Sequence, residues 1–269
     1  MSKLFQGLSV ALLLGVAQSG FAATIALYDA GLGGTPSSQP WLIYGSDGIL
    51  SGGTASQTAQ AGGTQLVTDG AVSAGYSNYN PFTLTPINGA FPILDATAGF
   101  SLDFDLHINA ESHSNANRAG FSVLLLDENS VGIELGFWEN EIWAQNVGFT
   151  HGEGVAFDTT ASANHFELSI VNSVYTLAAD SVQILSGSVR DYTSPGVPYE
   201  LGSYLFLGDD TGSAGADVFL GSITLNTAIA PTSSVPVPGS LILLLSGLAV
   251  LFRRGVQHEI CRSFFHRFA

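Results

Sequence analysis

The chain has 269 residues, of which 7 are Lys or Arg and 22 are Asp or Glu, and its formal net charge is −15. Residues 23–233 hold 21 of the acidic residues but only two basic ones, Arg118 and Arg190. So acidic a segment repels nucleic acid and anionic membranes, which excludes nucleic acid as a partner. The single cysteine, Cys261, lies outside this segment, so a thiol nucleophile, a disulfide and a Cys-ligated zinc are excluded for it as well.

Residues 1–22 have the three parts of a secretory signal peptide. Lys3 supplies the positive start, Leu8–Ala17 is the apolar segment, and the small residues Gly20 and Ala22 permit cleavage before residue 23. The sequence therefore predicts an N-terminal signal helix and export of the rest of the chain. The alternative, a buried N-terminal helix, leaves the Gly and Ala run after the apolar segment unexplained.

The next segment, through residue 95, is rich in Gly, Ser and Thr, and its strands are short. Thr24–Tyr28 and Trp41–Tyr44 are predicted strands, and a third covers Gln65–Thr68. Ser51–Gly63 has the composition of turns.

From Phe100 onward the strand pattern is clear. Apolar residues from Phe100 to Ile108 alternate with polar ones, which predicts a strand with one buried face. Short strands with tight turns such as Asn172-Ser173 indicate an all-β fold, an antiparallel β-sandwich in one domain over residues 23–228. The other predicted strands are Phe121–Leu126, Val131–Trp138, Ile142–Gln145, Phe166–Val171, Val174–Ala178, Val182–Val189, Tyr204–Leu207 and Val218–Leu225.

The C-terminal residues divide into three predicted parts. Residues 229–240 are a Pro/Ser linker, residues 241–254 are an apolar helix that ends in a basic pair, and residues 255–269 are a cytoplasmic or artefactual extension. The apolar stretch is shorter than the roughly 20 residues of a full span, so the prediction is a short transmembrane helix. The pair Arg253-Arg254 favours a cytoplasmic end.

This tail resembles the PEP-CTERM class of sorting signals. The matching residues are Val235, Pro236, Pro238, Arg253 and Arg254, with Val237 where the class usually has Glu. The resemblance implies processing by an exosortase-type membrane protease in a Gram-negative bacterium. It also implies export through the inner membrane, anchoring by the C-terminal helix, and a final place at the cell surface or outside the cell.

The central segment is similar to the domain called choice-of-anchor Y, a group of exported proteins with varied C-terminal anchors. The motifs that carry this similarity include Asn117–Ser122, Gly132–Trp138, Ile142–Gln145, Ser186–Tyr192 and Phe206–Asp209. The strand pattern also resembles the wider concanavalin A-like (laminin G-like) jelly roll. These resemblances imply a location and an architecture rather than an activity.

One pair of acidic residues has the spacing of a catalytic pair. Glu134 and Glu139 match the carboxylates of the Glu-x-Asp-x-x-Glu strand of laminarinase-type jelly-roll glycosidases, which they resemble, but Gly136 replaces the middle Asp. Residues five apart on a regular strand point to opposite faces, whereas a retaining mechanism needs carboxyl groups about 5–5.5 Å apart. The sequence therefore favours a structural or binding role for this motif over catalysis.

A carbohydrate-binding face is the preferred hypothesis for the site. Trp138 and Trp143 would stack on sugar rings, with Glu134 and Arg118 as polar contacts. Two alternatives stay open: Arg118 pairs with Glu134 or Glu111 to hold the sheet together, and the tryptophans pack in the core.

Calcium is a possible cofactor, and no other cofactor is predicted. Asp209, Asp210 and Asp217 are the candidate ligands, because hard cations bind six to eight oxygens from such loops. Ordinary turn chemistry and solvated charge explain these residues equally well. His113, His151 and His165 lack the spacing of a metalloprotease site.

These features together predict an exported, exosortase-sorted surface or extracellular-matrix protein that binds exopolysaccharide and has no catalytic activity. Two alternative functions stay open. One is a degenerate jelly-roll glycoside hydrolase that uses Glu134 and Glu139, and the other is a structural matrix protein without a specific ligand.

Overall fold

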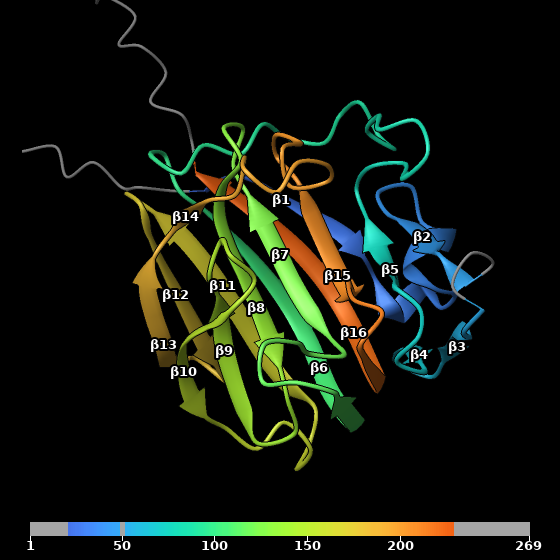
Figure 1. Ribbon diagram of the computed structural model, residues 1–269. Helices are drawn as coiled ribbons and strands as arrows, with labels where there is room; N and C mark the ends of the chain where they lie inside the picture. The colour runs from blue at the N-terminus through green and yellow to red at the C-terminus, as the bar shows by residue number, and fades with distance from the viewer. Residues whose placement is uncertain (1–20, 49–51, 229–269) are drawn as a thin grey trace, which may run out of the picture. The chain divides into compact units, whose positions relative to one another are not determined.

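The structure is a computed structural model that describes residues 21–48 and 52–228. These residues form two antiparallel β-sheets packed face to face (Figure 1). The predicted all-β antiparallel sandwich is thus confirmed. The predicted signal helix, the linker, the short transmembrane helix and the extension 255–269 lie outside the described residues.

The first sheet, called sheet A, has the strand order β13-β12-β11-β6-β16-β4-β3, and β1 also pairs with β16. Two long strands, β6 and β16, pair along most of their length and form its centre. The strands are β1 (Phe21–Tyr28), β3 (Ala55–Gln60), β4 (Gly63–Thr68), β6 (Phe100–His113), β11 (Asn164–Val171), β12 (Val174–Ala179), β13 (Val182–Ser188) and β16 (Ala214–Ala228).

The second sheet, sheet B, has the strand order β10-β9-β8-β7-β15-β5-β2, and a short strand β14 pairs with β8. Two 3-10 helices, η1 (Ala30–Leu32) and η2 (Pro36–Ser38), precede its edge strand β2. The strands are β2 (Ile43–Ser46), β5 (Ala74–Ser77), β7 (Ser122–Leu126), β8 (Val131–Phe137), β9 (Glu141–Gln145), β10 (His151–Ala156), β14 (Arg190–Asp191) and β15 (Leu205–Asp209).

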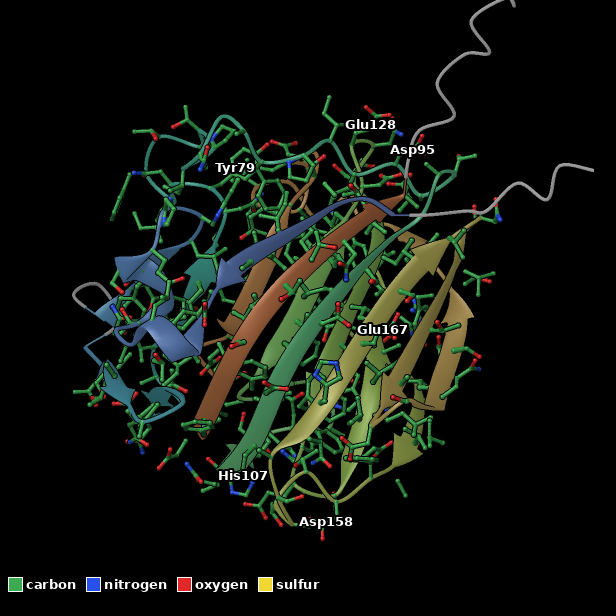
Figure 2. All side chains as sticks on the ribbon, turned by 180° about the vertical axis from the view of Figure 1, so that it is seen from behind. Tyr79, Asp95, His107, Glu128, Asp158 and Glu167 are labelled. Atoms are coloured by element: carbon green, nitrogen blue, oxygen red, sulfur yellow. The ribbon has the colours of Figure 1, made fainter. Side chains whose placement is uncertain are left out.

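The main core lies between the two sheets. Alternate residues of β6 point inward because successive side chains of a strand face opposite sides. Phe104 from sheet A meets Phe137 from sheet B edge to face at 6.0 Å, and Phe166 of the neighbouring strand stacks on Phe104 at 5.5 Å. Each such fully buried side chain contributes roughly 1.5–3 kcal/mol relative to an exposed one. The outward residues of the same sheet are polar, among them Glu167, which Figure 2 shows on the far face.

A second, smaller apolar cluster lies on the other side of sheet B. Leu124 and Leu126 of β7 point away from the main core and pack beneath Tyr192, Tyr199 and Tyr204. These tyrosines come from the chain between β14 and β15, which covers this face of the sheet. The outer face of sheet B is therefore apolar and partly covered by this segment, and a pocket lies between the two.

The sequence predictions differ from the structure at β3, β5 and β10. Residues 55–60, predicted as part of a turn segment, form β3, whose side chains are mainly exposed. The strands β5 and β10 were not predicted from the sequence. Glycines occupy positions in both, and a strand with glycine or with two exposed faces has no hydrophobic alternation to reveal it.

Candidate functional site

A pocket of about 540 Å³ opens on the outer face of sheet B. Its floor is one row of side chains that runs across neighbouring strands. Leu124 pairs with Phe206, Phe206 pairs with Ser77, and Ser77 pairs with Ile43. Because directly paired residues point to the same side of a sheet, these four side chains line the floor together.

A row of glycines beside these residues deepens the floor. Gly208 pairs with Gly75, and Gly75 pairs with Gly45 of the edge strand. A Cβ atom at Gly75 would come within 2.6 Å of Cζ of Phe206, so the Phe206 ring occupies the space left by the missing side chain. The glycines thus let an aromatic ring lie against bare backbone.

Two loops form the walls of the pocket and supply most of its aromatic rings. Tyr79 and Phe82 come from the loop after β5, and Tyr199 and Tyr204 come from the segment before β15. The Tyr79 hydroxyl donates to the Gly202 carbonyl at 2.8 Å and so ties the two walls together. With Phe206, five aromatic residues line the pocket.

Phe82 is presented to solvent at the rim by a small turn. The side chain of Asn80 accepts hydrogen bonds from the backbone N–H groups of Phe82 and Thr83, at 2.9 and 3.1 Å. Such an Asn turn fixes the backbone two residues further on. The Phe82 side chain is 89% exposed, which is unusual for a large apolar residue.

Polar groups of the pocket are carboxylates, hydroxyls and amides. Asp47 and Asp210 line it together with Ser46, Ser73, Ser77 and Asn80. Oδ1 of Asp47 accepts a hydrogen bond of 2.7 Å from the backbone N–H of Ser73, which fixes this carboxylate at the pocket edge. The pocket therefore combines flat apolar rings with hydrogen-bond acceptors.

Tyr199 connects Asp210 to a second, buried carboxyl group. The Tyr199 hydroxyl lies 3.0 Å from Oε2 of Glu134 and 2.9 Å from Oδ2 of Asp210. A hydroxyl has one proton, so it can donate a hydrogen bond to only one of the two carboxyl groups. The other carboxyl group must be protonated in order to donate a hydrogen bond to the hydroxyl oxygen. Burial of Glu134 raises the pKa of its carboxyl well above the ordinary value, and the charge of Asp210 raises that pKa further. The raised pKa therefore favours the protonated form of Glu134 in this trio.

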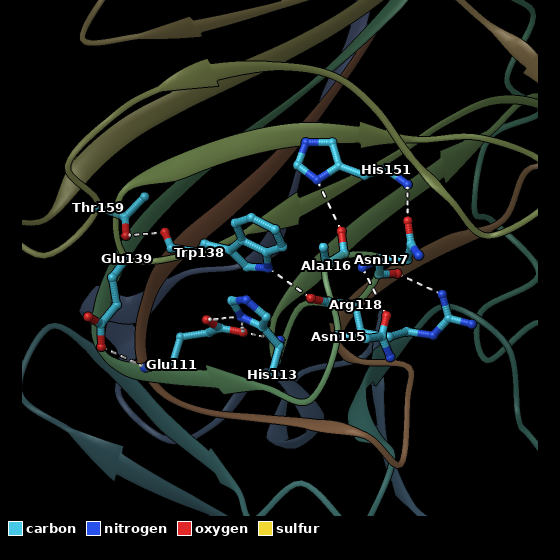
Figure 3. Close-up of polar contacts among 11 residues, drawn as sticks. Glu111, His113, Asn115, Ala116, Asn117, Arg118, Trp138, Glu139, His151 and Thr159 are labelled. Carbon is cyan, nitrogen blue, oxygen red and sulfur yellow. Dashed lines mark hydrogen bonds and ion pairs between the residues drawn. The ribbon is translucent and has the colours of Figure 1, made fainter.

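The candidate pair Glu134 and Glu139 does not form a dyad. Glu134 lies on the outer face of sheet B beneath Tyr199, whereas Oε1 of Glu139 accepts from the backbone N–H of Glu111 at 3.1 Å (Figure 3). The physical reason is that Glu139 belongs to the turn after β8, as its exposed position shows. The carboxyl group that does approach Glu134 belongs to Asp210, which is distant in sequence.

The two tryptophans of the hypothesis lie in a separate stack of rings. The His113 ring stacks on Trp138 at 4.2 Å, and the His151 ring stacks on Trp143 at 4.4 Å. Trp143 has no exposed surface, so the prediction that its ring is open to a sugar is wrong. Trp138 donates from its ring nitrogen to the Arg118 carbonyl at 2.8 Å and thereby holds the loop after β6 (Figure 3).

Arg118 makes no ion pair with Glu134 or Glu111, contrary to the alternative drawn from the sequence. Its guanidinium donates to the carbonyls of Asn117 and Phe149, at 2.6 and 2.8 Å, and lies 5.7 Å from the centre of the Phe149 ring. Glu111 pairs with His113 instead. Arg118 therefore ties a loop to the chain before β10 and is not a pocket residue.

The three candidate calcium ligands do not converge. Asp209 is fully buried, Asp210 contacts Tyr199, and Asp217 accepts from Gln65 and Asn109 on sheet A. Within residues 21–48 and 52–228, no three His, Cys, Asp or Glu side chains are placed to hold a metal ion. The reason is the strand geometry, since neighbouring Asp209 and Asp210 point to opposite sides.

The pocket residues were largely missed from the sequence. Three of them, Tyr79, Phe82 and Tyr199, lie in loops that have no hydrophobic periodicity. Phe206 lies in a predicted strand, but the sequence does not indicate which side of the sheet its side chain faces. The only sequence signal was the accumulation of tyrosines between residues 192 and 204. The sorting residues Val235, Pro236, Pro238, Arg253 and Arg254 lie outside the described residues.

Comparisons with known proteins give a fold likeness and no family. No protein-family model matches the chain, and no curated protein matches it. The part of the chain that the structure describes contains no helix long and apolar enough to cross a membrane. Solved structures, in contrast, match over much of the chain.

Three of these structures illustrate the likeness. The carbohydrate esterase vb_24B_21 of Shiga toxin-encoding bacteriophage phi24B is 14% identical, with 68% of this chain and 89% of that chain covered and a TM-score of 0.43. The exoplasmic/lumenal domain of VIP36, bound to Ca²⁺ and mannose units, is 12% identical, with 78% and 90% covered and a TM-score of 0.43. Domain 4 of AbnA, a GH43 extracellular arabinanase from Geobacillus stearothermophilus in complex with arabinotriose, is 13% identical, with 78% and 93% covered and a TM-score of 0.44.

These matches bear on one prediction from the sequence. The sequence analysis predicts a domain without catalytic activity, and the matched structures contradict it. They include the esterase, an alginate lyase and a sialidase from Trypanosoma rangeli. Lack of activity does not follow from a fold alone.

Proposed function

We propose that this protein is an exported polysaccharide-binding protein and that the pocket of sheet B is its binding site. One observation carries the proposal: five aromatic rings, two carboxylates and several hydroxyl and amide groups line a single pocket of about 540 Å³. Ligand pockets are typically about 300–1,000 Å³, mainly apolar, with a few fixed polar groups.

The chemistry of a sugar fits this combination of groups. A pyranose ring has an apolar CH face that packs on an aromatic ring, and its edge carries hydroxyl groups that donate to carboxylates and amides. In the pocket, Phe82 and Phe206 offer rings, while Asp47, Asp210 and Asn80 offer acceptors. The exposed ring of Phe82 at the rim favours a ligand that extends beyond the pocket, as a polymer does.

The location of the protein is part of the same proposal. The signal-like residues 1–22 support export, and the PEP-CTERM-like tail supports sorting by an exosortase-type protease to the surface of a Gram-negative bacterium. Intact mass measurement of the protein recovered from such a host tests this part. Loss of residues 1–22 and of the residues after Pro238 supports it, and an unprocessed chain contradicts it.

The binding proposal is tested with the purified full-length protein on a glycan array, with calcium and with EDTA. We expect binding to at least one polysaccharide, and a weaker signal for the variant Phe82→Ala. The variant Val182→Ala is the matched control, because Val182 is also an exposed apolar residue (64%) but lies on the edge strand β13 of sheet A. Absence of any glycan signal, or equal loss in both variants, contradicts the proposal.

A second candidate function is cleavage of the bound polysaccharide. The observation that favours it is the contact of the Tyr199 hydroxyl with both Glu134, whose pKa is raised by burial, and Asp210, which lines the pocket. Such enzymes use a pair of carboxyl groups, one of them with a raised pKa as the general acid. Release of new reducing ends from a bound glycan, abolished by Asp210→Asn and retained by Glu139→Gln, supports this function. No release from any bound glycan refutes it.

A further inference from the structure

The pocket carries acidic groups but no cationic ones. None of its lining residues, all of which the structure describes, is Lys, Arg or His, whereas Asp47 and Asp210 both line it. Asp210 is the carboxyl group of the trio that lines the pocket, since Glu134 is buried beneath Tyr199. Any ligand therefore meets negative charge at two places on the wall.

The two arginines of the described chain are bound elsewhere, although the charge of Arg118 acts against the rise in the pKa of Glu134. Arg118 is held by the carbonyls of Asn117 and Phe149, and Arg190 pairs with Glu153 of β10 at 2.6 Å. Neither side chain lines the pocket. An anionic sugar such as a uronate would thus enter an acidic pocket without a cationic partner, and like charges brought together disfavour binding.

From this charge distribution we infer that the pocket selects polysaccharides with cationic amino sugars over anionic ones. This inference rests on the proposed polysaccharide-binding function and names its ligand class. The ammonium group of a glucosamine unit would donate to Asp210 or Asp47 while the sugar ring packs on Phe82 or Phe206. Hydrogen bonds between charged groups are about twice as strong as neutral ones.

The long-range field of the protein acts in the same direction. The segment 23–233 contains 21 acidic residues and two arginines, so its field attracts cationic polymers and repels anionic ones. This contribution is screened by salt, whereas the contacts inside the pocket are screened less. A salt series therefore separates attraction by the whole surface from selection by the pocket.

The test compares three probes of similar length on the purified full-length protein. They are a glucosamine hexamer, its fully N-acetylated counterpart, which is neutral, and an oligouronate, which is anionic. We expect the glucosamine hexamer to bind at least about tenfold more tightly than the N-acetylated hexamer at 0.15 M salt, and the oligouronate to bind most weakly. The preference should persist at 0.5 M salt.

Variants locate the effect in the pocket. Asp210→Asn and Asp47→Asn each keep an acceptor oxygen and remove one charge, so each should lower the preference for the glucosamine hexamer over the neutral hexamer severalfold. Asp158→Asn is the control, because Asp158 is exposed in a loop outside the pocket and the substitution removes the same charge. A cooperative thermal melting transition shows that the pocket variants are folded.

The outcomes distinguish the inference from the function on which it rests. Equal or tighter binding of the neutral hexamer or the oligouronate overturns the charge inference and leaves the polysaccharide-binding function standing. Preference lost equally in Asp158→Asn, or lost at 0.5 M salt, also overturns it, because the whole surface then explains the effect. If none of these probes and no glycan on the array binds, both fall.

Discussion

The hydroxyl of Tyr199 lies 3.0 Å from the carboxyl of Glu134, although the two residues are 65 positions apart in the chain. Glu134 is on β8 and Tyr199 is in the segment that covers sheet B, so this contact closes the covering segment onto the sheet. A buried carboxyl group needs such a partner because an unpaired one costs several kcal/mol. The contact therefore links the pocket wall to the stability of the fold.

The first prediction concerns Glu134. Burial raises the pKa of its carboxyl in the folded protein above the value in the unfolded chain. At pH values between these two pKa values, only the folded protein keeps the proton. The unfolded protein then binds fewer protons, and stability falls as pH rises through this range. The variant Glu134→Gln cannot ionise, so its free energy of unfolding should fall less between pH 5 and pH 8. Urea denaturation at both pH values measures this, and an equally steep fall in the variant contradicts it.

The second prediction concerns Asp209, which has no exposed surface and an Oδ2 atom without a hydrogen-bond partner. Burial raises the pKa of its carboxyl to about 8. As with Glu134, the folded protein holds the proton more tightly than the unfolded one. The free energy of unfolding therefore falls progressively as the pH rises from about 4 to about 8. Asp209→Asn should increase the free energy of unfolding by about 1–3 kcal/mol at pH 8 and change it little at pH 4.

This difference between the two pH values is the critical measurement for Asp209. A variant that is equally destabilised at pH 4 and pH 8 would show that the carboxyl is needed for packing and that its charge has no role. The surface residue Asp158, whose pKa is lowered by its hydrogen bonds to Thr160, provides the comparison. Asp158→Asn should show no gain in stability at pH 8.

The third prediction concerns the glycine floor of the pocket. A Cβ atom at Gly75 would come within 2.6 Å of both the Leu207 carbonyl and the Phe206 ring. Gly75→Ala should therefore lower the free energy of unfolding by about 1–3 kcal/mol and weaken glycan binding. Gly89→Ala is the control, since a Cβ atom there meets nothing within 4 Å. Thermal melting of both variants measures the effect. An unchanged melting midpoint for Gly75→Ala would contradict the close contact between Gly75 and Phe206.

The fourth prediction separates the pocket from the tryptophan stack. Trp138→Phe removes the hydrogen bond to the Arg118 carbonyl, so it should lower the free energy of unfolding by about 1–2 kcal/mol. Because Trp138 does not line the pocket, glycan affinity should stay within about twofold of the unmodified protein. A large loss of affinity without a loss of stability would instead return the site to the tryptophans, as the sequence hypothesis had it.

The sequence by itself determined the strands that have one buried face. The alternation from Phe100 to Ile108 and the paired runs around Asn172-Ser173 were sufficient, because a side-chain period of two can be satisfied only by a strand with one side in the core. Both turn residues have positive φ, as a two-residue hairpin requires. The edge strand β3 has no such period, since both of its faces are mainly exposed.

The tertiary structure decided the site. Sequence spacing suggested Glu134 with Glu139, Arg118 with Glu134, and two tryptophans open to solvent, and none of these arrangements is present. Side chains from β2, β5, β7 and β15 meet in one pocket because the order of strands in sheet B differs from their order in the chain. Contacts between residues far apart in the chain determine which loops cover that face. They also determine which carboxyl group Tyr199 joins to Glu134. Local sequence patterns do not predict such contacts.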